Sequence, residues 1–252
     1  MRLRPANRDA AAGSLDEVKR LVAQIRGRWP AVKIVLRGDS GFCREELMAW
    51  CEQDQNRVDY LFGLQRNKRL HKIIGAQMHQ AQLLHQSTSK PARIFAEFSY
   101  KTKKSWSGAR RVVAKAEYLD KGENPRFVVT SLSAEEWPAQ DLYEKFYCAR
   151  GEMENRIKEQ MCLFAYRLST HEMKANQLRL YFSALAYALV EAVRRLALKG
   201  TEWAEARVDT IRLKLFKIGA IVRLSVRRVL LQLSSAYPWK ALFAHAYHAL
   251  RC

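Results

Sequence analysis

The sequence has few cysteines and none of the cysteine spacings that hold a metal or a disulfide framework. Its five cysteines are far apart and odd in number, and no two of them form a C-x-x-C pair. This pattern indicates neither a zinc site nor a set of disulfides, and it favours a reducing, cytoplasmic compartment. The cysteines are Cys43, Cys51, Cys148, Cys162 and Cys252.

Long apolar runs are also missing. The most apolar stretch, residues 184–193, contains Glu191 and is much shorter than the roughly 20 residues that a bilayer-spanning helix needs. The opening residues, Met1–Pro5, lead into polar sequence rather than into the apolar segment of a signal peptide. We therefore expect no membrane segment and no membrane partner.

Acidic residues are scarce relative to basic ones. Lys and Arg number 44 against 25 Asp and Glu, which leaves a formal net charge of +19. An excess of this size favours a polyanionic partner, because each phosphate that a Lys or Arg neutralises releases a condensed counterion. The basic residues are spread through mixed sequence rather than gathered on one amphipathic helix, so nucleic acid is favoured over an anionic membrane surface.

The first part of the chain alternates helix and strand. Apolar residues at three- and four-residue steps predict helices, and short β-branched or aromatic runs predict buried strands. This order is typical of an α/β sheet with parallel crossovers, and we assign residues 1–66 to its core. The predicted elements are a helix over about 14–26, a strand over 32–36, a helix over about 44–54 and a strand over 60–64.

Residues 67–136 are predicted to form an insertion into that core. A polar helix over about 67–86 precedes short alternating segments with charged or glycine-containing turns, which predict an antiparallel β subdomain. The predicted strands lie around 94–98, 112–114 and 127–129.

Residues 137–200 return to helix, and residues 201–252 form a basic C-terminal region with nine Lys or Arg against three acids. Apolar residues at helical spacing from Leu142 to Phe164 predict one long helix with a single apolar stripe. Further predicted elements are a helix over 174–198, a helix or strand near 211–216, strands within 220–234 and a short helix after Pro238.

Asp39 is the first candidate for a catalytic group. It follows the predicted strand 32–36 in a turn flanked by Gly38 and Gly41. Open α/β sheets place their working groups outside the carboxyl ends of their strands. The alternative interpretation is that Asp39 only caps the following helix or forms the turn.

Glu154 is the second candidate. On a helix, Tyr147, Arg150, Glu154 and Lys158 lie three or four residues apart and share one face, next to the apolar stripe. A carboxylate at the edge of the core can be held in place and still be reached by solvent or metal. The alternative interpretation is a solvated helix flank with pairing between Glu154 and Lys158.

The predicted turn at residues 100–106 (YKTKKSW) combines aromatic and cationic side chains. Trp106 could stack on an unpaired base while Lys103 and Lys104 bind phosphate. A solvated turn with a half-buried tryptophan is the alternative.

Several of these segments together resemble bacterial insertion-sequence transposases of the DDE type. The resemblance covers nearly the whole chain, and its most specific part is the Tyr-x-x-Arg-x-x-x-Glu pattern. The segments are Leu36–Phe42 (LRGDSGF), Phe62–Asn67 (FGLQRN), the run from Tyr147 to Glu154 and Met173–Leu180 (MKANQLRL).

The resemblance implies a ribonuclease-H-like catalytic domain interrupted by a β insertion, and two-metal phosphodiester chemistry with Mg²⁺ or Mn²⁺. It places Asp39 at the second catalytic aspartate and Glu154 at the final glutamate, both as metal ligands. Tyr147, Arg150 and Lys158 would contact the DNA strand. Apart from the resemblance, we expect further DNA contacts at Arg66, Lys103, Lys104 and Trp106. The implied partners are the double-stranded transposon ends, with a second copy or an intact transposase, in the bacterial cytoplasm near the nucleoid.

The sequence departs from this family in two ways. The signature lysine seven residues after the glutamate is Met161 here, and Lys158 is the candidate replacement. The first catalytic aspartate of the family would lie upstream of Met1. We therefore expect an N-terminally truncated transposase that lacks its first strands and is inactive alone; the alternative is a non-catalytic DNA-binding fragment that interferes with intact transposase.

Overall fold

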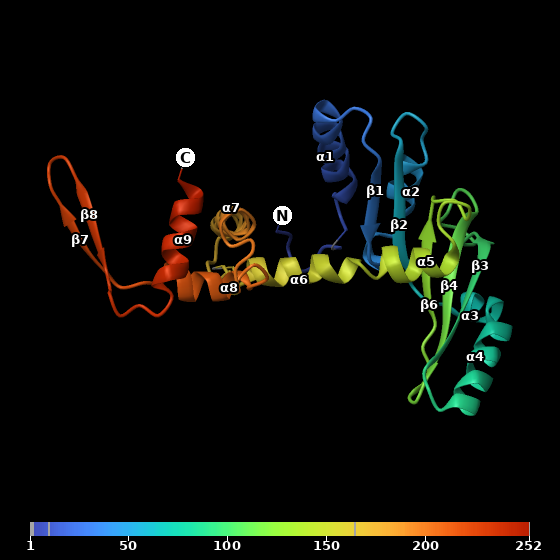
Figure 1. The fold of residues 1–252 in the computed structure, drawn as a ribbon. Helices are drawn as coiled ribbons and strands as arrows, with labels where there is room; N and C mark the ends of the chain where they lie inside the picture. The colour runs from blue at the N-terminus through green and yellow to red at the C-terminus, as the bar shows by residue number, and fades with distance from the viewer. Residues whose placement is uncertain (1–2, 10, 164, 252) are drawn as a thin grey trace. The chain divides into compact units, whose positions relative to one another are not determined.

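The computed structural model describes residues 3–9, 11–163 and 165–251 (Figure 1). The chain forms two compact units, Pro5–Gly151 and the remainder of the described chain. Both units contain helices, and the first contains a large mixed sheet, so the fold is a mixed α/β fold. The boundaries expected at residues 66, 136 and 200 stay predictions.

The sheet of the first unit runs in the order β1-β2-β6-β4-β3, and β5 pairs with β4. β1 and β2 are parallel, as the alternation of strand and helix predicts, whereas the other pairs are antiparallel. β6 lies directly along β2, so the strands expected in the insertion extend the same sheet. The strands are β1 Ile34–Gly38, β2 Val58–Leu64, β3 Ala92–Tyr100, β4 Arg110–Leu119, β5 Gly122–Glu123 and β6 Arg126–Thr130.

Apolar side chains cover both faces of this sheet. Tyr60 and Phe62 pack with Leu47 and other residues in one buried cluster. The residue between them, Leu61, packs with Val113 and others in a second cluster. Because successive strand residues point to opposite faces, β2 is buried on both sides and its sequence is almost continuously apolar.

Among the described residues, the first part of this unit contains four α-helices. α4 lies along β3 and β4 (Figure 1). The single helix expected over 67–86 is two helices, because α3 ends at Ile73 and α4 starts at Gly75; Asn67 caps α3 by accepting a hydrogen bond from the Leu70 amide. The helices are α1 Ser14–Arg28, α2 Glu45–Cys51, α3 Lys68–Ile73 and α4 Gly75–Thr88.

The long helix expected over 142–164 is interrupted; Phe164 lies outside the described residues. A short α5 (Ala139–Asp141) passes into the π-helical turn η2 (Leu142–Tyr147), and α6 (Arg150–Met161) starts after Cys148 and Ala149. The interruption changes the helical phase of α6 relative to η2. Met153 is therefore 59% exposed and Ile157 41% exposed, although the expected apolar stripe included both.

The second unit is largely helical around its own apolar core, which includes Leu163, Leu198 and Ile211. The helix expected over 174–198 and the helix after Pro238 are both present. No helix among the described residues is long and apolar enough to cross a bilayer. The elements after α6 are α7 Met173–Ala197, α8 Val208–Ile211, the π-helical η3 Arg212–Phe216, β7 Ala220–Leu224, β8 Val229–Leu233 and α9 Lys240–Leu250.

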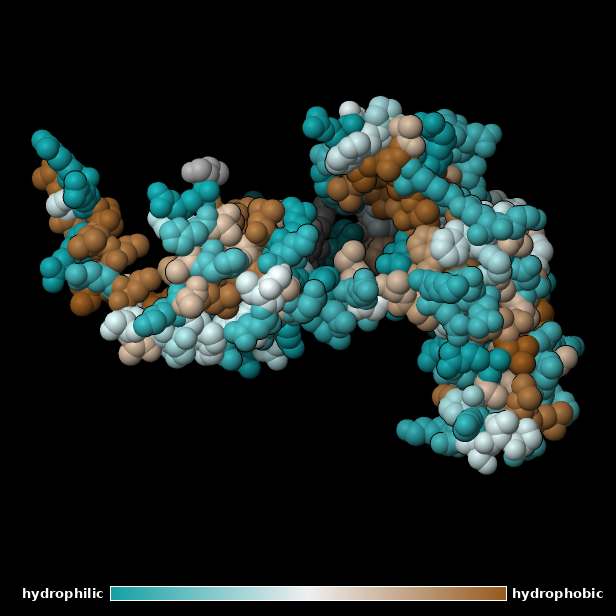
Figure 2. Space-filling view, in the orientation of Figure 1, coloured by the Kyte–Doolittle hydropathy of each residue, from teal (hydrophilic) through white to brown (hydrophobic). Residues whose placement is uncertain are grey.

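β7 and β8 form an isolated antiparallel hairpin in which every residue is exposed. The alternate positions of one face are all apolar, which is visible as brown side chains on the hairpin in Figure 2. That face comprises Ala220, Val222, Leu224, Val229, Leu231 and Leu233.

Candidate functional site

Asp39 lies immediately after β1, in a tight turn at the carboxyl end of the strand. It is the N-cap of the 3₁₀ turn η1 (Ser40–Phe42), and its Oδ1 accepts a hydrogen bond from the Gly41 amide at 2.9 Å. The side chain is exposed, and among the described residues Oδ2 accepts no hydrogen bond. Asp39 is therefore a capping residue, as the alternative interpretation holds, and its side chain is also accessible to solvent.

Tyr147 reaches the same turn from the end of η2. A Cβ added at Gly63 on β2 would lie 2.5 Å from the Tyr147 hydroxyl oxygen, 3.0 Å from the Ser40 amide nitrogen and 3.3 Å from the Asp39 carbonyl carbon. Glycine is the residue that fits at position 63, because any Cβ would overlap these atoms. The absence of a Cβ at Gly63 thus lets the end of β1, strand β2 and the Tyr147 hydroxyl meet.

Arg150 and Asp39 both influence Tyr147 electrostatically. The Arg150 guanidinium lies 5.8 Å from the centre of the Tyr147 ring. Burial raises the pKa of the Tyr147 phenol, the charge of Arg150 and its hydrogen bond oppose that effect, and the negative charge of Asp39 adds to it. Tyr147 therefore stays protonated at neutral pH and can donate a hydrogen bond.

Arg37 fastens the segment that carries Tyr147 and Arg150 to β1. Its Nη1 donates to the Phe146 carbonyl at 2.6 Å and its Nη2 to the Ala149 carbonyl at 3.2 Å. The guanidinium carbon also lies 5.8 Å from the centre of the Phe146 ring. These contacts span the interruption between η2 and α6, where the backbone changes from π-helical to α-helical hydrogen bonding.

Glu154 and Lys158 lie on α6, and both side chains are exposed. Glu154 follows Arg150 by one helical turn, and Lys158 follows Glu154 by another. Arg150, Glu154 and Lys158 therefore share one face of α6, whereas Tyr147, which the expected face included, lies in η2 before the interruption. Met161, at the position of the signature lysine, is half-buried at the end of α6.

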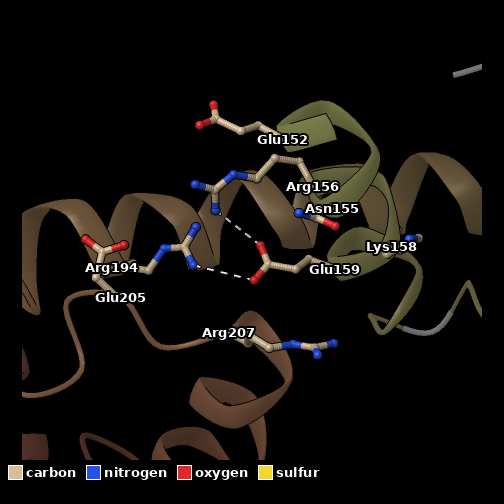
Figure 3. Close-up of a pocket in the computed structure, with 8 residues that line it drawn as sticks. All are labelled: Glu152, Asn155, Arg156, Lys158, Glu159, Arg194, Glu205 and Arg207. Atoms are coloured by element: carbon tan, nitrogen blue, oxygen red, sulfur yellow. Dashed lines mark hydrogen bonds and ion pairs between the residues drawn. The ribbon is translucent and has the colours of Figure 1, made fainter. Parts of the chain in front are cut away.

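A polar pocket of about 510 Å³ lies beside α6 in the second unit (Figure 3). Its inner wall is the buried Glu159, whose oxygens lie 3.3 Å from Arg156 and 3.7 Å from Arg194. Arg194, which comes from α7, also donates to the Ala206 carbonyl at 2.8 Å. These ion pairs connect α6 to α7, and Lys158 lies on the pocket wall. The lining residues are Glu152, Asn155, Arg156, Lys158, Glu159, Arg194, Glu205 and Arg207.

The loop between β3 and β4 separates its aromatic residue from its lysines. Trp106 is only 6% exposed and packs edge-on against Tyr100, with the Arg110 guanidinium 5.3 Å from its ring centre. Lys103 and Lys104 are exposed. The structure thus favours a structural role for Trp106, while the two lysines remain accessible.

Arg66 is exposed just after β2 and lines a pocket of about 410 Å³. Of the site residues expected from the sequence, Asp39, Tyr147 and Arg150 come together in the first unit. Two further residues of this site, Arg37 and Gly63, were not identified as functional from the sequence. Both lie inside the segments that resemble the transposases, but an arginine in a strand and a glycine in an apolar run carry no specific signal by themselves.

A family model described as transposase DDE domain group 1 matches residues 1–252. The search of curated proteins found no match. The mixed sheet with its flanking helices is compatible with the fold of DDE transposases, a family that acts on DNA and uses divalent metal ions, typically Mg²⁺. The chain belongs to the DDE transposase family.

Proposed function

We propose that this chain takes part in the cleavage and transfer of DNA strands at the ends of an insertion sequence, with a ribonuclease-H-like catalytic core in which Asp39 and Glu154 are metal ligands. The observation that carries the proposal is the meeting of Asp39, Tyr147 and Arg150 at the carboxyl end of β1. An acid, a protonated phenol and a guanidinium at one place suit a phosphodiester better than an uncharged substrate.

The residues present fit a divalent metal of the Mg²⁺ type. Asp39 and Glu154 are exposed carboxylates, and Oδ2 of Asp39 accepts no hydrogen bond among the described residues. Hard cations such as Mg²⁺ and Mn²⁺ prefer oxygen ligands of this kind. A bound metal pair would activate the attacking oxygen and stabilise the leaving oxygen of the phosphodiester.

The other residues would bind and orient the DNA. Tyr147 would donate a hydrogen bond from its phenolic hydroxyl to a phosphate oxygen near the scissile bond, and Arg150 would neutralise charge on the same strand. Lys158 would contact the strand further along α6. Arg66, Lys103 and Lys104 would bind the backbone electrostatically without reading sequence. Trp106 would have to leave the core before its ring could stack on a base.

Asp39 and Glu154 are two of the three carboxylates that a DDE site uses. We propose that cleavage requires a third carboxylate supplied in addition to them, and that the chain acts on paired transposon ends with a second copy or an intact transposase. Without that carboxylate, DNA binding and pairing would remain, and the chain would interfere with transposition rather than catalyse it.

The test is cleavage of a labelled duplex from the ends of the element that encodes the chain, in Mg²⁺ and in Mn²⁺. The chain and an N-terminally extended form are compared, each with Asp39→Asn, Glu154→Gln and, as control, Glu152→Gln. Asn at position 39 keeps the cap acceptor but removes the charge, and Glu152 is an exposed acid on the same helix as Glu154.

In whichever form cleaves, we expect cleavage to be lost with Asp39→Asn and with Glu154→Gln but not with Glu152→Gln. Cleavage by the chain itself would place the third carboxylate within residues 1–252. Full activity of Glu154→Gln would show that the metal ligand is another residue. Salt-dependent binding without cleavage in every form would favour the non-catalytic alternative.

A further inference from the structure

Arg37 connects the strand that ends just before Asp39 with the helical segment that carries Tyr147 and Arg150. It lies within β1, two residues before Asp39. Its guanidinium donates to the carbonyls of Phe146 and Ala149, three residues apart. Because both carbonyls bind one guanidinium, these two hydrogen bonds restrict the position and the orientation of the segment relative to β1.

The segment that Arg37 binds is an irregular part of the chain, between a π-helical turn and an α-helix. η2 ends at Tyr147 and α6 begins at Arg150, with a π-type hydrogen bond from the Cys148 amide to the Tyr143 carbonyl at 2.9 Å. π-helical turns are rare and often occur at functional sites. Regular helical hydrogen bonds do not continue across this interruption. A donor from another part of the chain, such as the Arg37 guanidinium, therefore helps to fix the backbone there.

An arginine suits this role because its planar guanidinium presents several N–H donors in a rigid fork. The two bonds from Arg37 use two different nitrogens, at 2.6 Å and 3.2 Å. The guanidinium also stacks near the Phe146 ring. A lysine would keep the charge but would place a single compact ammonium group between the two carbonyls.

We propose that Arg37 is a positioning residue that holds the Tyr147 hydroxyl against the Asp39 turn and the Arg150 guanidinium beside the Tyr147 ring, by fixing the backbone at Phe146 and Ala149. Arg37 does not contact the substrate itself; it acts through Tyr147 and Arg150. Its effect on strand cleavage rests on the proposed function, whereas its effect on the position of Tyr147 does not.

The experiment places 3-fluorotyrosine at position 147 of the full chain and follows its ¹⁹F resonance through a pH titration. The variants are Arg37→Gln, Arg37→Lys and, as control, Arg111→Lys. Arg111 lies in the same unit and also bridges backbone carbonyls, those of Leu132, Ser133 and Trp137, far along the chain from the Asp39 turn. Thermal unfolding of each variant verifies that it is folded.

We expect Arg37→Gln to shift the resonance and to increase the acid dissociation constant of the labelled phenol, because Tyr147 leaves its buried position beside Asp39. Arg37→Lys should give a smaller change in the same direction, and Arg111→Lys none. A folded Arg37→Gln variant with the wild-type resonance and titration would overturn the proposal.

A second measurement separates positioning from the proposed function. In the form that cleaves DNA, Arg37→Gln should lower kcat by about 100-fold, as misplacement of positioned groups does, with little change in KM. If the titration changes but no form cleaves, the proposed function fails and the positioning role stands. If KM rises and kcat is unchanged, Arg37 affects DNA binding and not the geometry of the reacting groups.

Discussion

The hydroxyl oxygen of Tyr147 lies where the side chain of residue 63 would begin, and Gly63 leaves that space open. A Cβ at this position would be 2.5 Å from the hydroxyl oxygen and 3.0 Å from the Ser40 amide nitrogen. The first neighbour is the end of a side chain, but the second is backbone of the turn that contains Asp39. Close packing thus couples the turn that contains Asp39 to the segment that carries Tyr147.

Substitution Gly63→Ala should destabilise the chain by about 1–3 kcal/mol and displace Tyr147, because neither neighbour can accommodate a methyl group without movement. Chemical denaturation gives the free energy of unfolding. Combination with Tyr147→Phe, which removes the hydroxyl, should recover part of that loss, and the double-mutant cycle should yield a coupling of about 0.5–3 kcal/mol. Additive effects of the two substitutions would mean that the contact is not made in solution.

A buried arginine connects α2 to the sheet and makes stability depend on pH. Arg110 is 5% exposed, and its guanidinium lies 2.6 Å from a carboxylate oxygen of Glu45 and 2.6 Å from one of Glu52. Burial alone would raise the pKa of Glu45, but hydrogen bonds from Arg110 and Ser107 lower it to about 2. Burial is likewise outweighed at Glu52, where hydrogen bonds from Arg110 and from the Tyr60 hydroxyl lower the pKa.

Both folded-state pKa values lie below the ordinary value of 4.5. The stabilisation is therefore complete above pH 4.5 and is lost as the pH falls from there toward 2, since the unfolded chain then binds more protons. Urea unfolding between pH 7 and pH 3 should show this loss. Arg110→Met should cost about 3–5 kcal/mol at pH 7, because it leaves two carboxylates without their buried partner, and should weaken the acid dependence.

Lys145→Met is the control for that measurement. Lys145 pairs with Asp141 at 2.9 Å, but its side chain is 69% exposed, and exposed pairs contribute at most about 1 kcal/mol. The same acid dependence in Arg110→Met as in the unsubstituted chain would assign the pH effect to other groups.

The sequence predicts the first unit well where one local pattern decides the structure. The parallel pairing of β1 and β2 and the position of Asp39 after β1 follow from an apolar run that ends in a glycine-flanked turn. The alignment of β6 along β2 does not follow, because the strand pattern states which face is buried but not which strand is the neighbour.

The interruption at Cys148 and Ala149 could not be predicted for a related reason. The apolar residues from Leu142 onward have the spacing of one continuous helix. A π-helical turn holds one more residue per turn than an α-helix, and no particular residue type marks its position in the sequence. Each added residue rotates the rest of the helix by about 100°. The sequence identifies Tyr147 and Arg150 as candidate site residues. It does not predict the hydrogen bonds from Arg37 to the Phe146 and Ala149 carbonyls, because these depend on the change in backbone geometry.

Lys103 and Lys104 should contribute to DNA affinity through charge alone. Each is exposed on the loop before β4. Replacement of either by Ala should reduce the slope of log K against log salt by about 0.9, the loss of one phosphate contact, with equal effect on specific and unrelated duplexes. Fluorescence anisotropy at several salt concentrations measures the slope. An unchanged slope in the double variant would place this loop outside the DNA interface.

Trp106→Ala provides the contrast for the lysine variants. Because Trp106 is buried, its truncation should cost about 3–5 kcal/mol in the free energy of unfolding. Weaker DNA binding with unchanged stability would instead support stacking of this ring on a base.

Lys158 is expected to replace the lysine that is missing at Met161. The two positions are three residues apart on α6, so they differ by about 60° around the helix axis and about 4.5 Å along it, which a lysine side chain can span. Lys158→Ala should weaken binding to the transposon end and reduce the salt slope by about 0.9. Met161→Lys in that background should restore both, because the ammonium group returns to the same side of the helix. If Met161→Lys strengthens binding by the unsubstituted chain while Lys158→Ala has no effect, Lys158 pairs only within its own helix, and this chain binds DNA without the signature lysine.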